Sequence, residues 1–127
     1  MYQLSYDEKL NILTIRLQGE LEEDKDLRLL MAEVHASVDE IDKTRSMNRL
    51  FDLREFSISG FNAEMVQAAA SILRSYNIDY NPIRIADLVS SDLMFGEHRA
   101  LAVFSELPHI DRGVFRSLKA AQDWLLR

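Results

Sequence analysis

The chain has 127 residues and no cysteine, and its formal net charge is -6, from 15 lysines and arginines against 21 aspartates and glutamates. This length suits one domain with one core, and the lack of cysteine excludes disulfides, thiolate metal ligands and cysteine nucleophiles. The acidic balance argues against a nucleic-acid binder, which needs a basic face to displace counterions from phosphates. No stretch resembles a signal peptide or reaches membrane-spanning length, so we expect a cytoplasmic protein with no integral membrane segment.

The first part of the chain predicts a hairpin, a helix and a buried strand. Apolar residues alternate on both sides of the turn sequence DEKLN, which predicts two strands within residues 2–19. Residues 21–42 carry apolar side chains every three or four positions, as in an amphipathic helix. These side chains are Leu27, Leu30, Met31, Val34, Val38 and Ile41. The apolar run MNRLFDL at 47–53 then predicts a buried strand.

The second part predicts three further helices alternating with strands. A serine- and glycine-bearing turn ends the segment FDLREFSISGF, residues 51–61, and Asn62 is a suitable N-cap for the next helix. The sequence PIRIADLVSS at 82–91 predicts a strand begun by a proline. Ser90 or Ser91 is then expected to cap a helix that runs to about Glu106. A short strand in HIDRGVF, residues 109–115, and a final helix capped by Ser117 complete the chain.

Alternation of strands and helices implies right-handed crossovers and parallel strand pairing. The opening hairpin adds one antiparallel strand. We therefore predict an α/β fold in which residues 1–127 form a single domain, with a mixed, mostly parallel sheet of about five strands and about four helices.

Four stretches, in this order, resemble the STAS domains, the fold of anti-sigma-factor antagonists, and in particular their SpoIIAA-like branch. They are LTIRLQGELEEDKDLRLLMAEV, RLFDLREFSISGF, IRIADLVSSDLMFGEHRALAVFSEL and GVFRSLKAAQDWL. The first pair is similar to the strand, first helix and switch loop of STAS domains. The other pair is similar to the Phe-Gly-x-x-Arg helix and the C-terminal Trp-Leu motif of the SpoIIAA-like branch. The resemblance covers nearly the whole chain.

The resemblance implies a binding or regulatory module that recognises a small or lipid-like ligand or a protein partner, and not an enzyme. Some STAS domains are switched by phosphorylation of the first serine in an Asp-Ser-Ser-Gly loop. A gapless overlay places Ser57, Ile58, Ser59 and Gly60 on that loop, so Ile58 occupies the phosphoacceptor position. A shift of one residue makes Ser57 or Ser59 the candidate phosphorylation site. The alternative is that Ser59 and Gly60 only shape the turn.

Ligands of open α/β sheets bind outside the carboxyl ends of the strands. Two predicted strands end at Arg54 and at Ser90 and Ser91, so we expect one crevice there, where Arg54 and Arg99 meet an acidic ligand. The alternative for Arg54 is a local ion pair with Asp52 or Glu55.

Aromatic side chains flank the same loops. Phe56 and Phe61, with Met94 and Phe95, are of the type that lines an apolar pocket, and core packing or a dimer contact is the alternative. The three histidines lie on separate elements, and neither a nucleophile elbow nor a nucleotide fingerprint is present. We therefore predict no metal, no cofactor and no catalytic residue, and a homodimer stays open.

Overall fold

The computed structural model describes residues 1–127, apart from the side chain of Asp24. Its five strands form one sheet in the order β1-β2-β3-β4-β5. They are β1 (Tyr2–Asp7), β2 (Ile12–Leu21), β3 (Asn48–Ile58), β4 (Ile83–Leu88) and β5 (Ile110–Phe115). β1 runs antiparallel to β2, and every other neighbouring pair is parallel. The mixed, mostly parallel sheet expected from the sequence is thereby confirmed.

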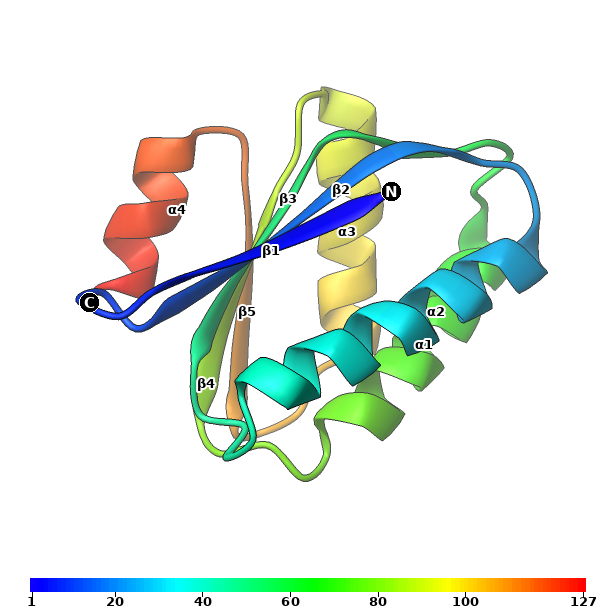
Figure 1. Ribbon diagram of the computed structural model, residues 1–127. Coiled ribbons are helices and arrows are strands. Elements are labelled where there is room, and N and C mark those ends of the chain that lie inside the picture. Colours follow the sequence, from blue (N-terminus) through cyan, green and yellow to red (C-terminus); the bar gives the residue numbers. More distant parts are fainter.

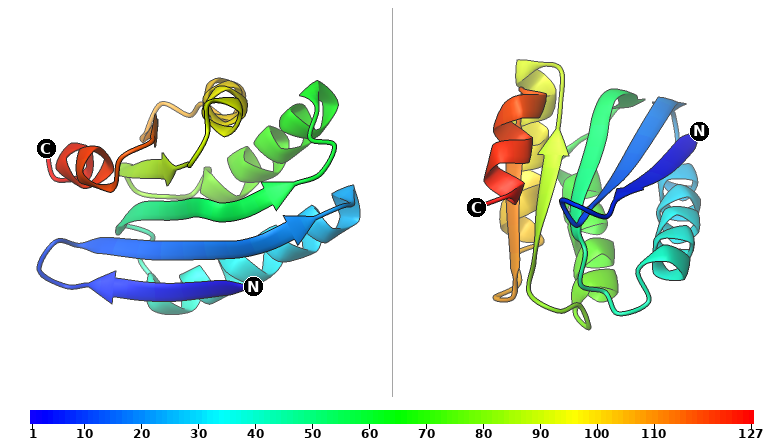
Figure 2. Two further views of the ribbon diagram at one scale, coloured as in Figure 1. Left: turned by 90° about the horizontal axis from the view of Figure 1, so that it is seen from above. Right: turned by 60° about the vertical axis from the view of Figure 1, so that its left-hand side comes forward.

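Three of the helices cover one face of the sheet, and the fourth covers the other (Figure 1). The helices are α1 (Asp24–Ile41), α2 (Ala63–Asn77), α3 (Asp92–Phe104) and α4 (Leu118–Leu125). Each parallel strand is laid beside the previous one by a right-handed crossover, so α1, α2 and α3 fall on the same face. In the right-hand view of Figure 2, α4 lies in front of β5 and α3 lies behind that strand.

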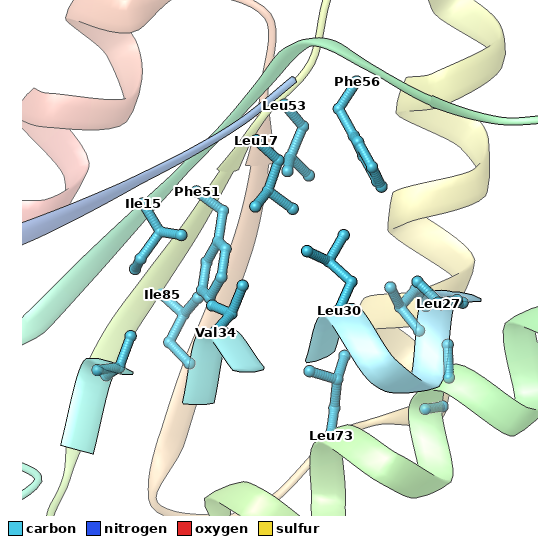
Figure 3. Close-up of a cluster of buried hydrophobic side chains, with 14 of the residues drawn as sticks. Ile15, Leu17, Leu27, Leu30, Val34, Phe51, Leu53, Phe56, Leu73 and Ile85 are labelled. Atoms are coloured by element: carbon cyan, nitrogen blue, oxygen red, sulfur yellow. The ribbon is translucent and has the colours of Figure 1, made fainter. Parts of the chain in front are cut away.

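The larger core lies between the sheet and α1–α3. Alternate side chains of the strands point into it, such as Leu13, Ile15 and Leu17 of β2. The apolar stripe of α1 faces them, as Figure 3 shows for Leu30 and Val34. A smaller core lies between the sheet and α4, where Leu50 and Leu88 pack against α4. The two cores explain why the central strands read as almost continuous apolar runs.

The predicted helix starts agree with the structure. Asn62, Ser91 and Ser117 each accept a hydrogen bond from the backbone N–H three residues ahead, at 2.9, 3.2 and 3.3 Å. An oxygen at this position satisfies one of the N–H groups that a helix start leaves without a partner. Between the two candidates for the third helix, Ser91 is the N-cap and Ser90 is not.

Two predicted boundaries were wrong. The segment after Arg54 is not a turn, because β3 continues to Ile58. A β-bulge interrupts the strand before this extension. The β2–β3 register shifts by one residue between the pairs Arg16–Asp52 and Gln18–Glu55. The extra residue interrupts the alternation that a regular strand shows, so the sequence reads as a loop.

The first helix begins at Asp24 rather than at residue 21, because β2 extends to Leu21. The predicted apolar stripe also ends earlier, since the side chain of Ile41 in the last turn is 41% exposed. Among the described residues, no helix combines the length and the apolar character that crossing a bilayer requires.

Candidate functional site

A cavity of about 190 Å³ lies inside the larger core, between the sheet and helices α1–α3. The sheet contributes Leu17, Leu53 and Phe56 to its wall, and Leu27 and Leu30 of α1 face them. Figure 3 shows these side chains pointing toward one another across the space between sheet and helix. Because the period of β3 changes at the bulge, Leu53 and Phe56 both face this core although they are three residues apart.

The cavity reaches the surface beside the loops that end β3 and begin α3. Ile58 and Phe61 are half-buried and line the cavity, and Leu93, at the start of α3, lines it while 73% exposed. An exposed leucine beside an apolar cavity is the kind of surface that a ligand covers. This cavity therefore opens at the carboxyl ends of the strands, where the sequence predicts a crevice.

One part of the cavity wall is charged. Asp87 of β4 is fully buried, and Arg112 of β5 donates two hydrogen bonds to it, each 3.0 Å long, from Nε and Nη2. Burial alone would raise the pKa of Asp87, but the positive charge and hydrogen bonds of Arg112, together with nearby His98, lower it to about 2. The pair therefore stays ionised and mutually neutralised at neutral pH.

Two histidines and a glutamate complete the polar part of the wall. Nδ1 of His35, on α1, is hydrogen-bonded to the backbone carbonyl of Met31 at 2.8 Å, and the imidazole ring stacks on Tyr76. Burial lowers the pKa of His35. His98 of α3 has its Nδ1 at 3.6 Å from Oδ2 of Asp87, which is too far for a hydrogen bond. Beside it, Glu97 has a pKa raised by partial burial.

Of the candidate residues predicted from the sequence, the structure brings Phe56, Ser57 and Phe61 to the cavity wall. Ser57 lies in β3 and is exposed. Ser59 is also exposed and its backbone N–H donates to the carbonyl of Leu21, which extends the pairing with β2. Gly60 follows with a φ of +67°, a conformation that favours glycine.

The two predicted arginines do not lie at this cavity. Arg54 is held by Asp52 through two hydrogen bonds of 2.9 Å, so the local ion pair is what forms. These bonds lower the pKa of Asp52 and raise that of Arg54. Asp52 shares a face of β3 with Leu50, which packs toward α4, so the pair lies on the side of the sheet away from the cavity.

Arg99 lies on another face of α3. Its guanidinium stands 5.7 Å from the ring of Phe95, and both residues line a second, more open hollow of about 630 Å³ beside β5 and α4. Ser90 and Ser91 line neither space: Ser91 caps α3, and the Ser90 hydroxyl points at the sulfur of Met94. The expected meeting of Arg54, Arg99 and these serines around one acidic ligand is therefore absent.

Sequence reasoning missed the buried ion pair of the cavity wall. Asp87 interrupts the apolar run IRIADLV, and a charge inside a buried strand is a usable signal, because it must have a partner. Its partner Arg112 lies 25 positions away, and nothing in the local pattern predicts that pairing. Among the described residues, no group of three or more His, Asp and Glu side chains is arranged to hold a metal ion.

Comparison with known proteins places this geometry in a fold class. No family model matches the sequence, and no curated protein is significantly similar to it. Its structure is similar to the crystal structure of an uncharacterized protein of the DUF3478 family with a SpoIIAA-like fold, from Shewanella loihica PV-4. The TM-score is 0.61 at 17% identity, over 98% of this chain and 92% of that chain. This chain therefore has a SpoIIAA-like fold, which confirms the architecture implied by the STAS resemblance.

Proposed function

We propose that this protein is a non-catalytic, cytoplasmic binding module that holds a small apolar ligand between the sheet and helices α1–α3. The observation that carries the proposal is the cavity itself: about 190 Å³, walled mainly by Leu, Phe, Met and Val side chains, and open beside Leu93. The SpoIIAA-like fold agrees with such a role without specifying it.

The size of the cavity limits the ligand. A dry cavity of about 150 Å³ lined by leucine, isoleucine and phenylalanine binds benzene, whereas a polar cavity of that size holds water. A space of 190 Å³ thus suits a substituted benzene or a short aliphatic chain. A longer lipid would have to leave part of its chain outside, against the exposed side chain of Leu93.

Two neighbouring alanines of α2 provide a matched test. Ala69 and Ala70 are both buried, but only Ala69 lines the cavity. We expect Ala69→Leu to fill the space and to weaken the binding of p-xylene by at least about tenfold, with little loss of stability, because the added methyl groups enter free volume. The measurements are an NMR titration with p-xylene and urea unfolding of the ligand-free protein.

Ala70→Leu is the control. It adds the same atoms at a buried position that lines neither described space, so it should cost about 1–3 kcal/mol of stability and leave p-xylene binding nearly unchanged in the folded fraction. Absence of saturable p-xylene binding to the parent protein would contradict the proposed function. Equal loss of binding in both variants would place the ligand elsewhere.

A phosphorylation switch acting on a protein partner is the second candidate function. The hydroxyl-bearing side chains of Ser57 and Ser59 are exposed, and Ser57 also lines the cavity, so a phosphate there would place negative charge at its edge. The intact mass of the protein purified from its own host distinguishes the candidates. One added phosphoryl group supports the switch, and a released organic mass supports the ligand.

A further inference from the structure

The charge balance of the cavity wall restricts the polar group that a ligand can carry. Both oxygens of Asp87 accept hydrogen bonds from Arg112, so neither charge of this pair is free to bind an ionic group. A ligand carboxylate would face two acidic residues, Asp87 and the partly buried Glu97, against the already engaged Arg112. Moving any ionic group out of water into this apolar space would add a further cost.

His98 is the polar group of the wall whose hydrogen bonding is incomplete. His98 lines the cavity, and its buried Nδ1 has no hydrogen-bond partner among the described residues. None of the hydrogen bonds among those residues engages its Nε2. Buried polar groups in folded proteins almost always have partners, and the charge of Asp87 beside Nδ1 accounts for this exception. The ring nitrogen left for a ligand is therefore Nε2.

The neighbouring carboxylate determines which ring nitrogen can accept a hydrogen bond. Nδ1 lies 3.6 Å from Oδ2 of Asp87, and the negative charge favours the tautomer with its proton on Nδ1, as in carboxylate–histidine pairs. Nε2 then carries a lone pair and accepts a hydrogen bond. A matching ligand group must therefore be a donor.

We propose that the cavity takes an uncharged apolar molecule of about eight non-hydrogen atoms whose single polar group is a hydroxyl, as in an alkylphenol, and that the hydroxyl donates to Nε2 of His98. This inference rests on the proposed function. It adds the chemical class of the ligand and the residue that selects it.

Four probes of nearly the same shape test the inference by calorimetric or NMR titration. p-Cresol carries a hydroxyl donor, p-xylene no polar group, 4-methylanisole an acceptor alone, and p-toluate a negative charge. We expect p-cresol to bind about tenfold more tightly than p-xylene and 4-methylanisole, the value of one satisfied buried hydrogen bond. p-Toluate should bind more weakly than p-cresol.

Substitution of His98 identifies the acceptor. His98→Leu should remove the advantage of p-cresol over p-xylene and leave p-xylene binding intact, whereas His109→Leu, which alters a histidine bonded to the carbonyl of Asn77, should preserve that advantage. The imidazole nitrogen NMR shifts of the unmodified protein give a readout that does not depend on the variant folding, because p-cresol should move the Nε2 signal of His98.

The outcomes separate the two proposals. If p-xylene binds and p-cresol binds no better, or if p-toluate binds best, the hydroxyl inference is overturned and the apolar site stands. If the advantage of p-cresol survives His98→Leu, or its binding leaves the Nε2 signal unmoved, His98 is not the acceptor. If none of the probes binds, the proposed function itself fails.

Discussion

At the scale of single residues, the buried pair Asp87–Arg112 dominates the electrostatics of the cavity wall. The side chain of Asp87 has no exposed surface, and that of Arg112 is 9% exposed. Arg112 also lies 5.7 Å from the ring of Phe51, so its charge is surrounded by packed groups. Such a pair adds little stability over a well-packed apolar pair, but the removal of one partner leaves a buried charge without compensation.

We expect Asp87→Asn to destabilise the protein by about 3–5 kcal/mol, because the guanidinium of Arg112 would stay buried without its counter-charge. Asp52→Asn is the matched control. Its partner Arg54 is 45% exposed, so water compensates the loss and the cost should stay within about 1 kcal/mol. Urea unfolding at neutral pH measures both. Similar costs for the two variants would contradict the special position of Asp87.

Acid unfolding provides a second measurement on the same variant. The pKa of Asp87 is about 2 in the folded protein, below its ordinary value of 3.8, so ionisation of this group favours folding. Its contribution is complete above pH 3.8 and is lost as the pH falls through the folded pKa of about 2. Asp87→Asn lacks this contribution. Its stability should therefore decrease less than that of the parent between pH 5 and pH 2, in the same urea series.

At the scale of elements, Gly96 and Gly113 differ in the space available for a side chain. Gly96 lies inside α3, and a Cβ atom there would meet nothing within 4 Å. Gly113 lies in β5, and a Cβ atom there would come within 2.8 Å of the Phe115 ring, which packs over this position against Trp124. A methyl group therefore fits the helix but not the strand.

We expect Gly96→Ala to stabilise the protein by about 0.5–1 kcal/mol, the usual difference between alanine and glycine in a helix interior. Gly113→Ala should destabilise it by about 1–3 kcal/mol, because the Phe115 ring must move away from Trp124. Thermal unfolding followed by circular dichroism measures both changes. A stabilising Gly113→Ala would show that the ring moves freely.

Most elements could be predicted from local patterns, because their causes are local. The 3.6-residue period of α2 and the capping oxygens of Asn62 and Ser117 depend on neighbours three or four positions away. The end of β3 could not be predicted. Its bulge is imposed by pairing with β2, whose residues lie more than 30 positions earlier.

The site was harder to predict than the fold. Phe56 and Phe61 were expected at a pocket and do line one, but their partners Leu27 and Leu30 looked like ordinary core residues of a helix. A cavity forms where side chains from several elements leave the space between them unfilled, so the sequence of a single segment does not predict it. Arg99 and Phe95, one helical turn apart on α3, both line the second hollow instead of the cavity.

At the scale of the whole molecule, the two faces of the sheet differ. Helices α1–α3 cover one face, whereas α4 packs mainly on β3, β4 and β5 on the other. The far face over β2 and the end of β3 is polar instead, and Arg16 and Gln18 both donate to Glu55 there. β4 and the first part of β3 are therefore covered on both sides, whereas β1 is an edge strand with largely exposed residues.

Hydrogen exchange should follow this gradient. We expect the slowest backbone amides in the parts of β3 and β4 that lie between the two cores, since they open only with global unfolding. Amides of β1 should exchange fastest among the strands, because separating this edge strand exposes little apolar surface. NMR-detected exchange gives the ranking. Protection of β1 equal to that of β3 would indicate that a further surface, such as a second copy of the chain, covers that edge.

The spatial order of the strands is the same as their order along the chain. Each strand after β1 therefore pairs with the strand that precedes it in the chain. The two ends of the chain do not have to come together for the sheet to form. The entropy cost of closing a connection grows only slowly with its length, and no connection in this sheet has to span the whole chain. The strands can therefore add to the sheet from β1 to β5, which is the order in which the ribosome synthesises them.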